Sequence, residues 1–212
     1  MNSTSTIAIL GGVGRTGNFV VQTLLHEGYS LKLLVRNPMT LSIKGAQIEV
    51  VEGDALNPDA IQYLVKDCQA VISTIGQRQG EPLVASLATR HILDAMKISN
   101  INRCVLVAGL NIDVPTDKKG PQTLMATQWM KEKFPTIQDD RQKAYALLAN
   151  SDVPWTLVRV PFIEFQEATG KITVSLEDCP GTKITAGDIA QFVVSQLRDD
   201  KFHYQAPFIA NL

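Results

Sequence analysis

The chain has 212 residues, of which 45% are hydrophobic and 19% charged, and its formal net charge is −1. This length suffices for one sizeable core and is short for two, so we expect residues 1–212 to form a single domain. The near-zero charge argues against a nucleic-acid-binding surface, and no apolar run reaches the about 18–20 residues of a membrane-spanning helix.

Three cysteines without C-x-x-C spacing give no sign of a zinc site or a disulfide framework, so we expect no metal. The first residues lack the basic segment and apolar stretch of a secretory signal, which makes a cytoplasmic location the expectation.

The first half of the chain alternates short β-branched runs with helical patterns. Thr6–Leu10 is expected to be a buried strand, and Arg15–His26 a helix that ends at Gly28. The elements expected next, in chain order, are strand 31–35, strand 47–51, helix 58–65, strand 70–75, helix 82–96 and strand 103–108.

The second half continues the alternation less regularly. Residues 111–121 are polar and read as a loop, and a helical region over 123–150 is expected to break at Pro135. The last expected elements are strand 155–160, helix 188–197 and strand 202–209. Strands alternating with helices predict an α/β fold, a doubly wound, mostly parallel Rossmann sheet with helices on both faces.

A glycine-rich turn separates the first strand from the first helix. Gly11, Gly14 and Gly17 have the spacing G-x-x-G-x-x-G. Glycine permits a tight turn and close approach of a pyrophosphate, and the unpaired amides of the helix start favour an anion. This context predicts a dinucleotide site, the alternative being a turn that only packs helix against strand. The predicted binding residues are Gly11, Gly14, Arg15, Thr16 and Gly17.

The end of the second strand indicates which dinucleotide binds. An acidic residue about 20 residues after the motif would hold the ribose hydroxyls of NAD. None is present here, and Arg36 instead offers a planar guanidinium suited to a 2′-phosphate, which Arg15 can also face. We therefore predict NADP(H) as cofactor; the alternative is that both arginines are solvated surface charges.

Five segments give the chain a family resemblance: the glycine turn, then 35–38, 53–55, 75–76 and 158–161. Together they resemble the atypical short-chain dehydrogenases/reductases, in particular the NmrA-like group, which includes NAD(P)H-dependent quinone, flavin and biliverdin reductases. The resemblance covers nearly the whole chain and says little about the substrate.

The resemblance also implies site residues. Asp54 and Ala55 would border the adenine, and Thr74, Ile75 and Gly76 would line the nicotinamide ribose. Pro161 and Phe162 would lie near the nicotinamide. Each of these has an ordinary alternative as a turn residue or strand terminator.

The proton relay usual in short-chain reductases, a tyrosine followed four positions later by lysine, is missing. Tyr29, Tyr63, Tyr145 and Tyr204 are followed by Leu33, Asp67, Ala149 and Phe208. Arg141 and Tyr145, four apart on one predicted helix, remain as catalytic candidates. Lys143 takes the role if the register slips by two, and an ordinary helix face is the alternative.

The predicted function is an NADPH-dependent oxidoreductase that transfers hydride to a conjugated small-molecule electron acceptor, such as a quinone or flavin. Such an acceptor spreads the added charge and needs no dedicated proton donor. Substrate-side segments are expected around 110–122 and 162–180, where Phe162, Ile163 and Phe165 are either an apolar floor or core residues. The alternative is a non-catalytic NADP(H)-binding redox sensor that regulates a protein partner; an oligomer is compatible with either.

Overall fold

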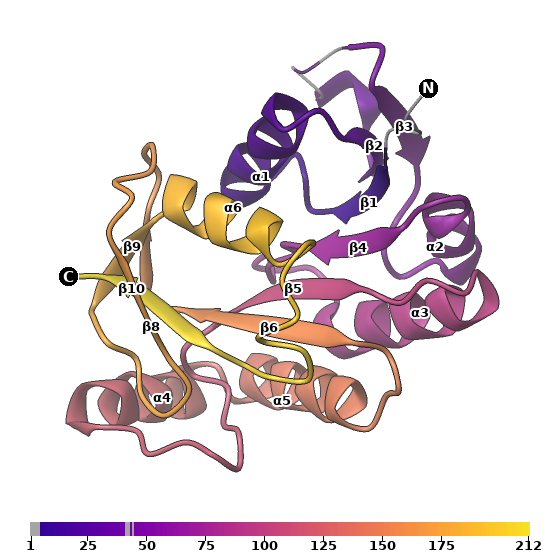
Figure 1. The fold of residues 1–212 in the computed structure, drawn as a ribbon. Coiled ribbons are helices and arrows are strands. Elements are labelled where there is room, and N and C mark those ends of the chain that lie inside the picture. The colour runs from indigo at the N-terminus through magenta and orange to yellow at the C-terminus, as the bar shows by residue number, and fades with distance from the viewer. Residues whose placement is uncertain (1–4, 41–42, 44) are drawn as a thin grey trace.

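A computed structural model describes residues 5–40, 43 and 45–212. Within these residues, ten strands form one sheet in the order β3-β2-β1-β4-β5-β6-β10-β9-β7, with β8 paired to β10 (Figure 1). Strands β1 to β6 pair in parallel, as does β10 with β6. The prediction of a doubly wound, mostly parallel α/β fold is confirmed.

The strands are β1 (Thr6–Leu10), β2 (Ser30–Val35), β3 (Ile48–Glu52), β4 (Ala70–Ser73), β5 (Cys104–Gly109), β6 (Trp155–Val160), β7 (Phe162–Glu164), β8 (Ile172–Ser175), β9 (Lys183–Thr185) and β10 (Phe208–Asn211). The helices are α1 (Arg15–His26), α2 (Pro58–Val65), α3 (Ala85–Ile98), α4 (Pro121–Lys133), α5 (Pro135–Ala149) and α6 (Ala186–Ser195), with a 3-10 turn at Pro38–Thr40.

The strand order changes direction at β1, which lies between β2 and β4. Leu10, the last residue of β1, pairs with Leu34 on one side and with Ser73 on the other. Ligands of open parallel sheets bind outside the carboxyl ends of the strands at such a point. The register therefore puts the glycine turn that follows Leu10 at the edge where a ligand is expected.

Two hydrophobic layers enclose the sheet. Val20, Val21 and Leu24 of α1 and Ile189 and Val193 of α6 are buried in one cluster. The other cluster holds the buried side chains of α2, α3 and α5, among them Ile61, Leu64, Ala88, Ile92 and Leu148. Helices α1 and α6 thus cover one face of the sheet, and α2, α3 and α5 cover the other (Figure 1).

Most predicted elements agree with the structure, and the differences lie where long-range contacts decide. Strand β4 ends at Ser73 rather than at residue 75, so Thr74–Gly76 lie outside the sheet. Helix α3 begins at Ala85, three residues after the predicted start. The predicted final strand begins six residues late, at Phe208, after a turn in which Tyr204 has a positive φ of 58°.

Strands β7, β8 and β9 were not expected from the sequence. Each has only three or four residues, too few for an alternating pattern to stand out. They extend the sheet beyond β10, partly in antiparallel pairing. The stretch after β6 is therefore an ordered extension of the sheet.

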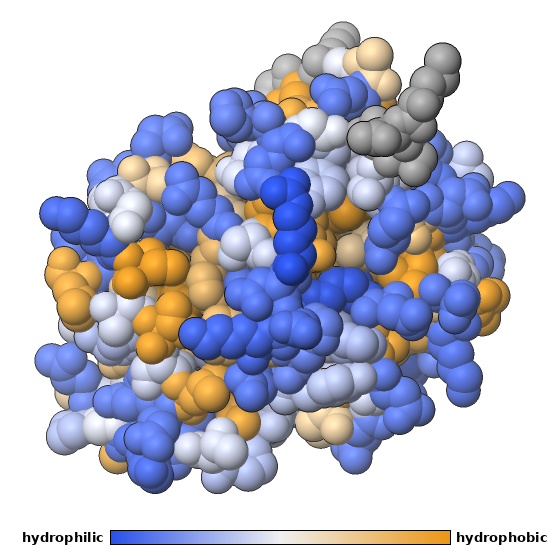
Figure 2. All heavy atoms as spheres, in the orientation of Figure 1, coloured by the Kyte–Doolittle hydropathy of each residue, from blue (hydrophilic) through white to orange (hydrophobic). Residues whose placement is uncertain are grey.

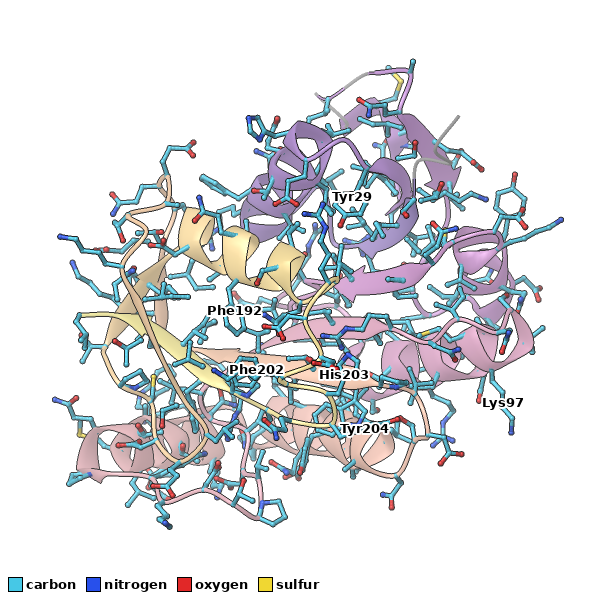
Figure 3. The ribbon with its side chains drawn as sticks, in the orientation of Figure 1. Tyr29, Lys97, Phe192, Phe202, His203 and Tyr204 are labelled. Atoms are coloured by element: carbon cyan, nitrogen blue, oxygen red, sulfur yellow. The ribbon has the colours of Figure 1, made fainter. Side chains whose placement is uncertain are left out.

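Contacts of aromatic residues hold the C-terminal end of α6 in place. Phe192 of α6 contacts Phe202, with ring centroids 5.8 Å apart, and both residues are labelled in Figure 3. The Arg198 guanidinium donates to the Tyr29 hydroxyl at 2.9 Å, which ties this end to the start of β2. On the face drawn in Figure 2, hydrophilic side chains predominate and hydrophobic ones are dispersed among them.

Candidate functional site

A cavity of about 870 Å³ lies along the carboxyl ends of the parallel strands. It brings together thirteen of the fifteen residues that the sequence analysis singled out. These are Gly11, Gly14, Arg15, Thr16, Arg36, Asp54, Ala55, Thr74, Ile75, Gly76, Arg141, Tyr145 and Pro161. Residues of the glycine turn, of the strand ends and of α5 thus line one space.

The glycine turn at the start of the cavity has no room for side chains. Gly11 has φ +80°, and a methyl group on it would meet Thr74 Oγ1 at 2.8 Å. Thr74 in turn donates from Oγ1 to the Gly11 carbonyl oxygen at 3.2 Å. The Gly14 amide donates to the same oxygen at 2.9 Å, so two hydrogen bonds engage the Gly11 carbonyl within the turn.

Helix α1 begins at this turn without a side-chain cap. Its N-cap is Gly14, no described side chain accepts from its first amides, and its first turn holds no acidic residue. By contrast, the N-cap side chains of two other helices accept hydrogen bonds: Asn57 caps α2 and Thr185 caps α6. Because the first amides of a helix lack internal partners, the start of α1 can accept an external anion.

Gly17, predicted to bind the cofactor, does not line the cavity. It is buried against the turn, and a methyl group there would lie 2.0 Å from the Gly11 carbonyl oxygen. Its role in this structure is the close approach of α1 to the turn. That is the purpose of a third glycine in such motifs.

Phe162, expected near the nicotinamide, also lies outside the cavity. It is the first residue of β7, and 74% of its surface is exposed. Alternate residues of a strand point to opposite faces, so Ile163 turns inward and lines the cavity instead. Phe165 lines it as well, which leaves Ile163 and Phe165 as the apolar wall on this side.

The Arg36 guanidinium is already engaged by a carboxylate. Nη1 and Nη2 donate to the two carboxylate oxygens of Glu81 at 2.9 and 3.1 Å. This contact raises the pKa of Arg36 and lowers the pKa of Glu81. Arg36 thus lines the cavity, and its guanidinium faces a partner 45 residues later in the chain.

Arg15 faces the opposite wall of the cavity. Its guanidinium carbon lies 4.1 Å from the centroid of the Phe165 ring. This cation–π contact joins the glycine turn to the segment after β7, and a guanidinium so placed is not paired with Arg36 around one phosphate. The expectation that Arg15 faces the same group as Arg36 has no support in this geometry.

The Asp54 side chain makes a local hydrogen bond. The sequence leaves open whether this residue is an ordinary turn residue. Its Oδ1 accepts a hydrogen bond from the Leu56 amide at 2.8 Å, which is an Asx turn between β3 and α2. The side chain therefore shapes the turn while the residue lines the cavity. The adjacent Ala55 carbonyl lies 3.2 Å from Nδ1 of His91.

The start of α3 is capped from α5. Asp140, which is buried, accepts hydrogen bonds from the amides of Ala85 and Ser86 at 2.8 and 3.3 Å and from the Ser86 hydroxyl at 2.5 Å. These contacts explain why α3 starts at Ala85 rather than at Pro82. The Asp140 carboxylate, which is next to Arg141 in the sequence, is thus engaged in capping α3.

Arg141 and Tyr145 lie one helical turn apart on α5 and both line the cavity. No described residue accepts a hydrogen bond from the Arg141 guanidinium, which points toward Gly109. Burial lowers the pKa of Arg141, and Asp140 partly opposes this. Burial raises the pKa of the Tyr145 phenol, with a smaller opposing effect of Arg159, so Tyr145 stays protonated at neutral pH. The neighbouring Lys143 faces a different hollow.

That second hollow, of about 740 Å³, lies between α3 and α5 at the amino ends of β5 and β6. It is at the wrong edge of the sheet for a nucleotide. Among the described residues, no group of three or more histidine, cysteine or acidic side chains is arranged to hold a metal ion. No helix in the described part of the chain is long and apolar enough to cross a bilayer.

Two residues of the site were missed by sequence reasoning. Glu81 stands in a polar loop, and nothing in its neighbourhood indicates a contact with Arg36. Asp140 lies inside a helix and carries no local capping signal, because the helix that it caps is α3. Only the fold brings either residue to its partner.

The chain is similar to a known protein family and to individual proteins. A family model described as NAD(P)H-binding matches residues 11–200. The protein TIC 62 of pea chloroplasts (Pisum sativum) is 24% identical over 221 residues, which cover 90% of this chain and 39% of that protein. This chain therefore spans well under half of the length of that relative.

Solved structures share the fold. ChuY, an anaerobillin reductase from Escherichia coli, superposes with a TM-score of 0.81 at 19% identity, over 98% of this chain and 97% of that one. A short-chain dehydrogenase/reductase from Veillonella parvula, solved in complex with NADP, gives a TM-score of 0.76 at 16% identity, over 98% and 94% of the two chains.

Proposed function

Since the chain belongs to the NAD(P)H-binding family, we propose that it is an NADPH-dependent oxidoreductase that passes hydride to a conjugated acceptor such as a quinone or flavin. The reduced dinucleotide supplies the hydride when it is bound. One observation carries the proposal: an uncapped helix start and an unpaired guanidinium, that of Arg141, line the same cavity. The first suits a diphosphate and the second an acceptor that gains negative charge.

The strand order gives each part of the cavity a task. The amides at the start of α1 bind the diphosphate, because they have no other acceptor. Arg36, Asp54 and Ala55, at the ends of β2 and β3, hold the adenosine side. Thr74, Ile75, Gly76 and Pro161, at the ends of β4 and β6, border the nicotinamide side.

The acceptor is expected against α5 and the segment after β7. Ile163 and Phe165 offer an apolar wall for a flat ring system. The protonated Tyr145 hydroxyl donates a hydrogen bond to the acceptor oxygen, and Arg141 stabilises the charge that builds on it. Neither task requires the missing tyrosine–lysine relay, which favours a conjugated acceptor over a simple ketone.

The test is NADPH consumption, followed at 340 nm, with menadione, FMN, an aromatic aldehyde and an aliphatic ketone as separate acceptors. We expect turnover with menadione or FMN, and at least about tenfold less with Arg141→Met, whose uncharged side chain is of similar length. Arg90→Met, at the second hollow, is the matched control and should keep full turnover.

Two results would contradict the proposal. Turnover of the ketone alone would exclude a conjugated acceptor. Tight NADPH binding without turnover of any acceptor would favour the alternative function, a redox sensor that binds NADP(H) and regulates a protein partner. ChuY is an anaerobillin reductase and the Veillonella protein a short-chain dehydrogenase/reductase, which supports a reductase by analogy.

A further inference from the structure

The Arg36–Glu81 contact lies in the part of the cavity where the proposed function expects the adenosine ribose. Both residues line the cavity. The ion pair is bidentate, because Nη1 and Nη2 of Arg36 each donate to a different carboxylate oxygen of Glu81. Resting on that proposed function, we infer that Glu81 occupies the place of the cofactor 2′-phosphate and so determines how strongly the chain distinguishes NADP from NAD. Glu81 is thus a specificity-determining residue.

The geometry explains why the Glu81 carboxylate and a 2′-phosphate exclude each other at Arg36. A guanidinium presents one bidentate edge of paired N–H groups per acceptor, and Glu81 uses the Nη1/Nη2 edge. A phosphate bound by the same groups would bring two negative oxygens to the carboxylate, where like charges repel. A 2′-phosphate that takes this edge therefore has to displace Glu81, whereas the 2′-hydroxyl of NAD does not.

The segment around Glu81 is built as a folded loop over the cavity. The Gln77 side-chain amide donates to the carbonyl oxygens of Arg78, Glu81 and Pro82 at 3.0, 3.0 and 3.1 Å, and its Oε1 accepts from the Val84 amide at 3.3 Å. These contacts hold the backbone of the loop and leave the Glu81 carboxylate to Arg36. Gly80, with φ +76° and open space around it, precedes Glu81 directly. The carboxylate can move while the loop stays folded.

A second guanidinium shares the same carboxylate. Arg78 Nη1 lies 3.7 Å from Glu81 Oε1, and Arg78 also lines the cavity. Displacement of Glu81 therefore frees two guanidinium groups, and the 2′-phosphate can take both. A surface ion pair by itself contributes little to stability. We therefore interpret the two arginines as a site for an anion, in which Glu81 is the replaceable occupant.

The test measures binding rather than turnover. Dissociation constants of NADPH, NADH, 2′,5′-ADP and 5′-AMP are determined by calorimetry for the wild type, Glu81→Gln and Glu52→Gln. Glu52, an exposed residue at the end of β3 outside the cavity, loses the same charge and serves as the control. We expect Glu81→Gln to tighten NADPH and 2′,5′-ADP by about tenfold, with NADH and 5′-AMP changed less than about twofold.

The dependence on Arg36 gives a second readout. In an Arg36→Ala background, Glu81→Gln should change the affinity for 2′,5′-ADP by less than it does in the wild type, because the Arg36–Glu81 contact is already absent and only the Arg78 contact remains. Unchanged or weaker NADPH binding by Glu81→Gln would overturn the inference, as would an equal gain for NADH or the same gain in Glu52→Gln. A tenfold gain in a protein that reduces no acceptor would leave the inference standing and remove only the proposed reaction.

Discussion

The α-carbon of Gly17 faces the carbonyl oxygen of Gly11 so closely that a methyl group on Gly17 would lie 2.0 Å from that oxygen. The same methyl would be 2.7 Å from Thr74 Oγ1. One contact thus joins the first turn of α1, the glycine turn and the residue after β4. The anion site at the start of α1 exists only while these three segments keep this approach.

Gly17→Ala should therefore push α1 away from the turn. We expect a loss of about 1–3 kcal/mol in the free energy of unfolding and a clear rise in the NADPH dissociation constant. The free energy of unfolding is measured by urea unfolding, and the NADPH dissociation constant is measured by cofactor fluorescence. Gly45→Ala, where a methyl meets nothing within 4 Å, should change neither. Normal NADPH affinity in Gly17→Ala would contradict the assigned role.

Tyr145→Phe separates hydrogen bonding to the acceptor from cofactor binding. Removing the hydroxyl should lower kcat with a quinone by about tenfold, the cost of one lost hydrogen bond, and leave the NADPH dissociation constant unchanged. Burial raises the pKa of this phenol, so turnover should not decline through Tyr145 ionisation up to its ordinary value of about 10. A fall in kcat centred well below that pH, absent in Tyr145→Phe, would argue against a neutral Tyr145.

Asp188 should make stability depend on pH in the acid range. Burial alone would raise its pKa, but hydrogen bonds from Thr185, Asn211 and Thr169 outweigh burial and lower the pKa to about 2. A carboxylate with a depressed pKa contributes its full stability above the unfolded value of about 3.9 and loses it as the pH falls toward 2. The contribution amounts to about 2 kcal/mol.

Asp188→Asn tests this directly by urea unfolding at pH 7, 5 and 3. We expect the wild type to be the more stable protein by a constant margin at pH 7 and pH 5, and by a smaller margin at pH 3. A margin that stays the same at pH 3 would show that hydrogen bonds to the ionised carboxylate are not its source.

Arg159 is fully buried in β6 and should be essential for stability. Its Nη1 donates to the Ile112 carbonyl at 3.0 Å and to Asp117 Oδ2 at 2.8 Å, and its guanidinium stacks on the Phe208 ring at 3.5 Å. Arg159→Met would leave Asp117 with the Val114 amide, which donates to Oδ2 at 3.0 Å, and with Lys119 at 3.7 Å as a more distant cation. We expect a loss of about 3–5 kcal/mol, measured by urea unfolding.

The pair Asp117 and Arg159 provides its own control. Adding Asp117→Asn to Arg159→Met should recover part of the lost stability, because the second change removes the unpaired charge. Additive losses in the double variant would mean that the ion pair contributes little and that the stacking on Phe208 matters more.

Much of the fold was predictable because its signals are local. The apolar run of β1, the proline at the start of α2 and the break at Pro135 each act within a few residues, and these elements have the expected bounds. The family resemblance, carried by short motifs in the right order, is likewise confirmed by the match over residues 11–200. Short-range periodicity was insufficient for β7, β8 and β9, whose pairing partners lie elsewhere in the chain.

The sequence by itself determined the glycine turn, its position between β1 and α1, and the presence of an arginine at the end of β2. These follow from backbone conformation and from the order of residues along the chain. Only the tertiary structure decided that Arg36 faces Glu81, that Asp140 caps α3 and that Phe162 points away from the cavity. The reason is physical: a side chain's partner depends on which segments the sheet brings together, and those segments lie about 45 and 55 residues apart in the chain.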